Sequence, residues 1–199
     1  AGGEMVDGDE ILYVIAHANL AALNGAVVGT QMSNLGLERA LQKLGLGLHR
    51  ARVGDRYVME MLQQKQLRLG GEGSGHIINL NLALTGDGII SALQVLSAMR
   101  KTGQGLRALL AGMTKFPQTL VNVSLPRRLE AALQAQVDGL VREAERQLGD
   151  LGRILVRPSG TEPLLRVMVE GEDRVQVDRL AEDLAGQMSA LLGATKNGN

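Results

Sequence analysis

The chain has 199 residues, which is enough for one large domain or two small ones with hydrophobic cores of their own. Its 21 Lys and Arg residues balance 21 Asp and Glu residues, and only 2% of the residues are aromatic, so neither a positive field nor stacking rings favour nucleic acid as a partner. The absence of cysteine excludes disulfides and Cys-ligated zinc and fits a cytoplasmic protein. No apolar run approaches the roughly 20 residues that cross a bilayer, so no membrane partner is expected.

Helices and strands alternate through the first 115 residues. Apolar spacing and end residues predict helices over 11–23, 35–44, 57–66, 87–100 and 106–113, and strands over 25–30, 49–53, 67–69 and 77–82. Asp7 and Asp9 are expected to accept hydrogen bonds from the free N–H groups of the first helix, and Asp87 to cap the helix at 87–100. One face of that helix carries Ile89, Ile90, Leu93, Leu96 and Met99. The alternation predicts an α/β domain with a mostly parallel or mixed sheet.

The pattern changes after Phe116-Pro117. The remaining chain predicts a strand over 119–125, a helix over 129–148, strands over 153–156 and 164–169, and a helix over 173–192. This order is typical of a smaller α+β domain with helices on one face of an antiparallel sheet. We expect the domain boundary near 115–118 and a disordered tail over 195–199.

The loop between the two late strands reads Arg157-Pro158-Ser159-Gly160-Thr161-Glu162-Pro163. A phosphate dianion needs converging N–H and hydroxyl donors and a forked cation, and this loop offers both. Arg166, within the next strand, can converge on the same anion. The alternative is a plain hairpin turn whose Ser and Thr bond their own backbone.

A glycine-rich loop, Gly70-Gly71-Glu72-Gly73-Ser74-Gly75-His76, lies between two predicted strands. Glu72, Ser74 and His76 alternate toward one side, and a carboxylate, a hydroxyl and an imidazole together suit a polyol. A flexible turn with a capping Glu explains the same residues. Neither a dinucleotide-binding fingerprint nor a Walker loop fits, because no helix and no Gly-Lys-Ser/Thr follows.

Two further loops lie at strand ends, where ligands bind in α/β sheets. Asp55 and Arg56 follow the second strand and are assigned to the edge of a cleft, although Asp55 as a helix cap and Arg56 as a surface charge are the alternative. Ser33 or Asn34 follows the first strand and is expected to cap the next helix. Asp7-Gly8-Asp9 resembles half of a magnesium loop but lacks a third carboxylate at Ile11, so no metal site is expected. No serine has an adjacent base of the His-Asn type, so no catalytic nucleophile is expected either.

Six motifs in sequence resemble the C-terminal half of the α-D-phosphohexomutase superfamily, most closely its branch acting on glucosamine phosphates. They are Val6-Asp7-Gly8-Asp9, Gly29-Thr30-Gln31-Met32-Ser33-Asn34, Val53-Gly54-Asp55-Arg56-Tyr57-Val58, Gly71-Glu72-Gly73-Ser74-Gly75-His76, Thr85-Gly86-Asp87-Gly88, and the Arg157 to Pro163 run. The resemblance implies a remnant of a second domain over 1–24, a third α/β domain with a mixed sheet over 25–115, and a smaller α+β C-terminal domain, TATA-box-binding-protein-like, over 119–194.

The resemblance also implies roles for single residues. Glu72, Ser74 and His76 would bind the sugar, and the non-reacting phosphate would be bound by Arg157, Ser159, Gly160, Thr161 and Arg166. The implied reaction interconverts glucosamine 6-phosphate and glucosamine 1-phosphate through glucosamine 1,6-bisphosphate. A phosphoserine and Mg²⁺ would carry it, and neither the serine motif nor the three-aspartate metal loop is in this sequence.

Because the chain opens on Ala1 within what reads as a turn, we expect a fragment that binds phosphosugar without catalysing, from a full-length enzyme for which a homodimer is left open. A glucose- or mannose-phosphate mutase and a non-catalytic phosphosugar-binding module are the alternatives.

Overall fold

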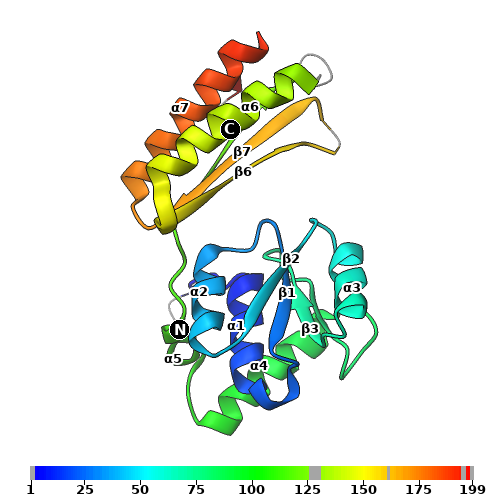
Figure 1. Ribbon diagram of the computed structural model, residues 1–199. Helices are drawn as coiled ribbons and strands as arrows, with labels where there is room; N and C mark the ends of the chain where they lie inside the picture. Colours follow the sequence, from blue (N-terminus) through cyan, green and yellow to red (C-terminus); the bar gives the residue numbers. More distant parts are fainter. Residues whose placement is uncertain (1–2, 126–130, 161, 194–195, 198–199) are drawn as a thin grey trace. The chain divides into compact units, whose positions relative to one another are not determined.

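The computed structural model describes residues 3–125, 131–160, 162–193 and 196–197. It divides into two compact units, residues 1–115 and 116–199, each of which is described by itself (Figure 1). Among the described residues, the helices are too short or too polar to span a bilayer.

The first unit is a layered α/β domain. Its helices are α1 (Gly8–Ala18), α2 (Leu35–Lys43), α3 (Asp55–Gln64), α4 (Gly88–Thr102) and α5 (Leu106–Leu109), with 3₁₀ turns η1 (Leu20–Ala22) and η2 (Leu110–Gly112). Its strands are β1 (Ala26–Thr30), β2 (Gly47–Ala51), β3 (Leu69–Gly71) and β4 (Ile77–Asn79), in the order β2-β1-β3-β4. Only β4 runs antiparallel to its neighbour, which confirms the predicted mixed sheet.

Both faces of this sheet are covered by helices. Side chains alternate along a strand, so successive residues of β1 point into different cores. Val27 on β1 faces a core built with α1, α2 and α4, whereas Val28 faces a second core built with α3. Every residue of β1 is buried, as expected for an inner strand of a parallel sheet.

Helix α1 begins three residues earlier than predicted. Asp7 and Glu10 form a reciprocal capping box, which satisfies the first free N–H groups at Gly8 rather than at Ile11. Leu12 and Ile15 are fully buried in the core of this unit. Residues 8–18 are therefore part of the α/β unit, not the separate remnant that the resemblance implies for 1–24.

Helix α4 forms where predicted, and Asp87 caps it by accepting hydrogen bonds from the N–H groups of Ile89 and Ile90. Its apolar face, however, is open to solvent: Ile89 is 75% exposed, Leu93 59% and Leu96 57%. The helix packs against its own unit through the buried Ser91 and Ala98 and the partly buried Val95 and Met99.

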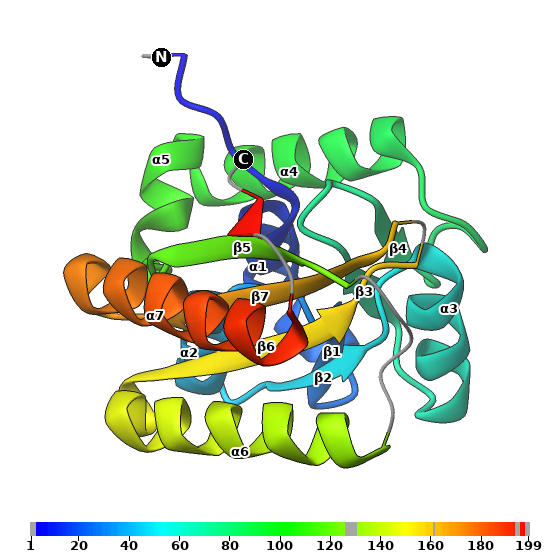
Figure 2. The same cartoon turned by 90° about the horizontal axis from the view of Figure 1, so that it is seen from above.

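The second unit is an α+β sandwich of two helices on one sheet (Figure 2). Its elements are β5 (Gln118–Ser124), α6 (Ala131–Leu148), η3 (Gly149–Leu151), β6 (Gly152–Pro158), β7 (Leu164–Gly171), α7 (Arg174–Leu192) and β8 (Lys196–Asn197). The sheet order is β6-β7-β5-β8, antiparallel throughout. One continuous core joins α6 and α7 to the sheet, which confirms the predicted antiparallel sheet with helices on one face. The comparison with the TATA-box-binding protein stays a prediction.

The end of the chain differs from prediction in part. Lys196 and Asn197 form β8, paired with Val123 and Asn122 of β5, so the predicted disordered tail does not hold for these two residues. The other predicted tail residues, 195 and 198–199, lie outside the described residues. So do residues 129 and 130, where we predicted the start of the helix that is described from Ala131.

Candidate functional site

Three loops of the first unit share one edge of its sheet. Strands β1, β2 and β3 run parallel, so the segments that follow them, 31–34, 52–54 and 72–76, emerge at the same side (Figure 1). The predicted sugar-binding residues and the predicted cleft-edge residues are therefore neighbours.

The carboxylate of Glu72 is fixed by the neighbouring loop. Its Oε1 accepts a hydrogen bond of 2.9 Å from the backbone N–H of Gly54. Gly54 has φ of 125°, a backbone conformation that residues other than glycine rarely adopt. Glu72 is half-buried.

Helix α1 supports the same loop. The N–H of Gly8 donates to the carbonyl oxygen of Gly73 at 2.9 Å, and a Cβ on Gly8 would come within 1.9 Å of the carbonyl oxygen of Glu72. A turn closed by the N–H of Gly75 and the carbonyl of Glu72 shapes the tip. Ser74 stands exposed at this tip, with the backbone on either side anchored.

His76 lies against the backbone of the 85–88 loop. A Cβ on Gly86 would fall 2.2 Å from its Nε2, so the imidazole occupies the space that a side chain at 86 would need. The same Nε2 is 3.6 Å from Oδ2 of Asp55 and is buried, and no described residue hydrogen-bonds it. The Asp55 carboxylate thus faces the loop at 72–76, and its place at the edge of a cleft stays a prediction.

Arg56 points along helix α3 instead. Its Nε forms an ion pair with Glu60 at 2.9 Å, one turn further on, and its side chain is 81% exposed. The hydrogen bond from Arg56 to Glu60 raises the pKa of Arg56. The structure therefore favours the surface-charge alternative for this residue.

Asp9, for which the sequence predicts a capping role, is instead buried between two loops. It lies inside α1 and is 4% exposed, and its Oδ2 accepts a 2.7 Å hydrogen bond from the backbone N–H of Asn34. Burial raises the pKa of the Asp9 carboxyl, whereas the Asn34 N–H lowers it by less; Asp7 raises it, and Ser33 and Arg50 lower it. Asp9 joins the 31–34 loop to the helix that supports the 72–76 loop.

The 31–34 loop is built as a rigid support. Ser33 is fully buried and its Oγ accepts from the N–H of Thr30, while Asn34 caps α2 by accepting from the N–H of Gly36. Arg50 on β2 donates to the carbonyl oxygens of Thr30 and Ser33 and pairs with Glu38. The predicted capping role of Asn34 is confirmed.

In the second unit, two arginines occupy opposed positions. Arg157 on β6 and Arg166 on β7 are Cα partners in the antiparallel register, and Asn122 on β5 continues the row. The Nε atoms of both arginines and the Oδ1 of Asn122 are buried, and no described residue hydrogen-bonds them. Burial, and after it the charge of Arg166, lowers the pKa of Arg157.

The loop that follows Arg157 presents a further donor. Ser159 Oγ is buried without a hydrogen-bond partner among the described residues, and its backbone N–H closes the loop on the carbonyl of Leu164. Gly160 is exposed, and Thr161, also predicted to bind phosphate, lies outside the described residues. The carboxylate of Glu162 offsets part of the charge of Arg166, with 3.3 Å between Glu162 Oε2 and Arg166 Nη2.

A magnesium site does not fit the residues at hand. Within residues 3–125, 131–160, 162–193 and 196–197, no three His, Asp or Glu side chains converge as a metal requires. Asp7 caps α1 and pairs with Lys115, so its oxygens are already engaged.

Family models match both units. The alpha/beta/alpha domain III of the phosphoglucomutase/phosphomannomutase family matches residues 7–116, and the C-terminal domain of that family matches residues 120–187.

Curated relatives are similar over nearly the whole chain. The phosphoglucosamine mutase of Halorhodospira halophila is 61% identical over 185 residues, which are 92% of this chain and 41% of that protein. The phosphoglucosamine mutase of Methylococcus capsulatus is 56% identical over 194 residues, which are 96% of this chain and 43% of that protein. The chain thus spans less than half the length of these relatives.

Solved structures share the fold. The Aspergillus fumigatus N-acetylphosphoglucosamine mutase in complex with GlcNAc-6P and magnesium has a TM-score of 0.76 at 23% identity, covering 94% of this chain and 44% of that one. A single-site variant of that mutase in complex with glucose 1,6-bisphosphate has a TM-score of 0.70, with the same identity and coverage. At such identities the likeness concerns the fold alone.

Proposed function

The chain belongs to the phosphoglucomutase/phosphomannomutase family, and from this premise we propose that it is the C-terminal part of a phosphoglucosamine mutase. That enzyme interconverts glucosamine 6-phosphate and glucosamine 1-phosphate and is an isomerase of cytoplasmic sugar metabolism. The choice of substrate rests on relatives of that name at 52–61% identity.

The observation that carries the proposal is the row of Arg157, Arg166 and Asn122. Two guanidinium groups opposed across adjacent strands repel each other unless an anion lies between them. The Nε atoms of both arginines and the Ser159 Oγ have no hydrogen-bond partner among the described residues, and they fit the oxygens of a phosphate monoester. This row would bind the phosphate that does not react.

The loop at 72–76 would bind the sugar. Glu72, fixed by Gly54, presents a carboxylate oxygen that accepts from a ring hydroxyl, and the exposed Ser74 both donates and accepts. His76, whose Nε2 lies near Asp55 without a hydrogen-bond partner in the described part of the chain, would donate to or accept from a further hydroxyl or the 2-amino group. Together these groups orient the ring while the phosphate row fixes its far end.

The reacting phosphoryl group would be transferred by parts outside this chain. A phosphoserine and Mg²⁺ would supply the transfer and the charge neutralisation, with glucosamine 1,6-bisphosphate as the intermediate. The described residues of this chain do not form a magnesium site, so its own contribution is binding and orientation. A homodimer of the full-length enzyme stays a prediction.

Two measurements test the proposal. The full-length protein that contains this chain is expected to convert glucosamine 6-phosphate with a higher kcat/KM than glucose 6-phosphate or mannose 6-phosphate, and a reversed preference would contradict the assignment. The 199-residue chain alone is expected to bind glucosamine 6-phosphate in a calorimeter without turnover. Turnover by a preparation free of full-length enzyme would contradict the division of roles.

A further inference from the structure

Helix α4 carries an apolar stripe that its own unit does not cover. Ile89, Leu93 and Leu96 lie at i, i+4 and i+7 and share one side of the helix, and all three are more than half exposed. Leu82, in the segment before the helix, is 57% exposed beside them. We call these four residues the α4 face. A stripe at this spacing normally marks the buried side of a helix, yet α4 turns Ser91, Val95, Ala98 and Met99 toward its own core instead.

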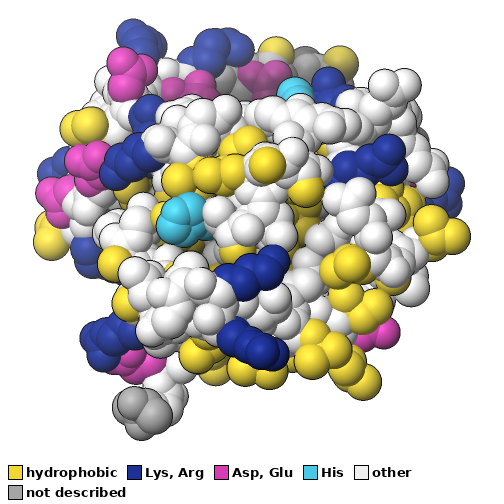
Figure 3. All heavy atoms as spheres, turned by 90° about the horizontal axis from the view of Figure 1, so that it is seen from below, with side chains coloured by type: hydrophobic (Ala, Val, Ile, Leu, Met, Phe, Trp, Pro, Cys, Tyr) yellow, Lys and Arg dark blue, Asp and Glu magenta, His cyan; other side chains and the backbone are white. Residues whose placement is uncertain are grey.

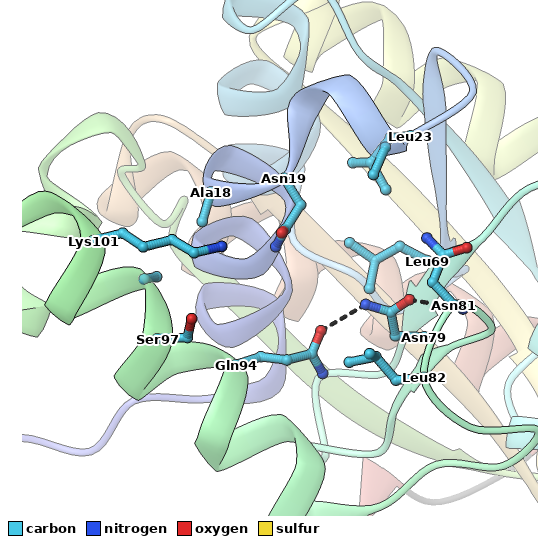
Figure 4. A pocket seen from close by; sticks show the side chains of 12 residues that line it. Ala18, Asn19, Leu23, Leu69, Asn79, Asn81, Leu82, Gln94, Ser97 and Lys101 are labelled. Atoms are coloured by element: carbon cyan, nitrogen blue, oxygen red, sulfur yellow. Dashed lines mark hydrogen bonds between the residues drawn. The ribbon is translucent and has the colours of Figure 1, made fainter.

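The α4 face continues into a hollow. Leu82 and Leu93 line a shallow depression that shares Gln94 and Ser97 with a deeper cavity of about 260 Å³. Figure 4 shows that cavity between α1, α4 and the 79–82 segment. Figure 3, which views the molecule from below, shows groups of exposed hydrophobic side chains separated by polar ones and by Lys and Arg.

The hollow is lined by side chains that suit a polypeptide. Asn79 donates to Gln94 at 2.6 Å, and Asn19 and Asn81 add further amides at the rim. Side-chain amides both donate and accept, so they pair with backbone N–H and C=O groups of an incoming chain. Lys101 at the edge has no ion-pair partner among the described residues and would donate to a carboxylate.

We propose that the α4 face is the docking surface for the N-terminal portion that full-length phosphohexomutases carry and that this chain does not span. The chain covers 43% of the Methylococcus capsulatus relative, and its second unit matches the C-terminal domain of the family, so more than half of such a protein precedes the matched part. An apolar face beside amide groups is typical of an interface within one protein. The proposal does not depend on which sugar phosphate is bound.

The experiment uses this chain and the N-terminal portion of the Methylococcus capsulatus relative, prepared separately. Titration calorimetry is expected to detect their association, and Ile89→Glu/Leu93→Glu is expected to weaken it at least tenfold. Val175→Glu is the matched single-site control. Like Ile89, Val175 is the second residue of its helix, is 75% exposed and donates its N–H to an Asp cap, but it lies on α7. This control is expected to change the affinity less than twofold.

A second readout does not depend on the stability of the charged variant. The sequence has no cysteine, so Leu96→Cys and Val175→Cys each provide a single thiol. Mass spectrometry of this chain measures the rate at which each thiol is alkylated. When the N-terminal portion is added, alkylation at 96 is expected to slow at least tenfold, whereas the rate at 175 is expected to stay unchanged.

Three outcomes would overturn the proposal. The first is that the two portions do not associate. The second is that the wild type and Ile89→Glu/Leu93→Glu bind with equal affinity while the thiol at 96 stays reactive. The third is that the free chain forms a dimer that Ile89→Glu/Leu93→Glu dissociates. In the last case the face binds a second copy of this chain.

Discussion

Arg157 and Arg166 are directly opposed across strands β6 and β7, so that two guanidinium groups share one face of the sheet. Like charges opposed across strands destabilise a sheet by roughly 0.2–1 kcal/mol. An anion bound between them reverses the sign of that interaction. A phosphate bound there, as proposed, would therefore couple the folded state of the second unit to binding.

We expect phosphate to stabilise the wild-type chain more than either arginine variant. In phosphate-free buffer, Arg166→Met should be at least as stable as the wild type, because the repulsion is removed. Added phosphate should raise the Tm of the wild type and not that of Arg157→Met or Arg166→Met. Differential scanning calorimetry measures both, with Arg146→Met, an exposed arginine on α6, as the control. An equal phosphate response in all four proteins would contradict the anion site.

Binding of glucosamine 6-phosphate should depend more on Arg157 than on Glu162. Loss of a charge-assisted hydrogen bond costs about 1.5–3 kcal/mol, so Arg157→Ala should weaken binding at least about tenfold. Glu162→Ala frees Arg166 and should change binding less. Equal losses in titration calorimetry would remove the phosphate-binding role from Arg157.

Gly86→Ala should act through His76. A methyl group at 86 would lie 2.2 Å from the His76 Nε2 and turn the imidazole away. The affinity for glucosamine 6-phosphate should fall as far as it does in His76→Ala, and the double variant should lose no more. Gly105→Ala, where a Cβ meets no atom within 4 Å, is the control. Additive losses would show that the two positions act independently.

Gly8→Ala should disturb the loop at 72–76. Gly8 and Gly88 both begin a helix after an Asp cap, but a Cβ on Gly8 meets the Glu72 carbonyl at 1.9 Å, whereas a Cβ on Gly88 meets no atom within 4 Å. Overpacking costs about 1–3 kcal/mol, while Gly→Ala at the open helix position stabilises by up to about 1 kcal/mol. Urea unfolding should give opposite signs for Gly8→Ala and Gly88→Ala. Equal signs would mean that α1 does not support the loop as described.

Asp9 should make stability depend on pH. Burial raises the pKa of its carboxyl in the folded state above about 3.9 in the unfolded chain, so the folded state binds the proton more tightly. The stabilising contribution is complete below pH about 3.9 and is lost as the pH rises through the folded-state pKa. The stability of Asp9→Asn relative to the wild type should therefore increase over that window and then level off. Urea unfolding across the pH range measures the difference, and Asp138→Asn, on the exposed side of α6, is the control. A difference independent of pH would contradict the raised pKa.

Sequence reasoning succeeded where the determinants are local. The caps by Asp87 and Asn34 are confirmed because each depends on an acceptor two or three residues from its donor. The order of strands and helices followed from apolar spacing, and Arg166 was paired with Arg157 from their places on adjacent strands.

The sequence does not predict environments that are set by residues far away along the chain. Asp9 was assigned to capping because its partner, the N–H of Asn34, lies 25 residues away. The open side of α4 could not be predicted either, since an apolar stripe indicates burial without saying whether the same unit provides the cover. Strand β4 ends at Asn79 because a turn from Asn79 to Leu82 replaces the ladder.

The 72–76 loop holds its backbone by contacts from Gly54 and Gly8 and leaves the Ser74 side chain exposed at its tip. A replacement at 74 therefore alters the chemistry offered to a ligand while the supporting turn is kept. If the proposed sugar-binding role of Ser74 holds, a set of variants at this single position changes sugar selectivity without unfolding the loop.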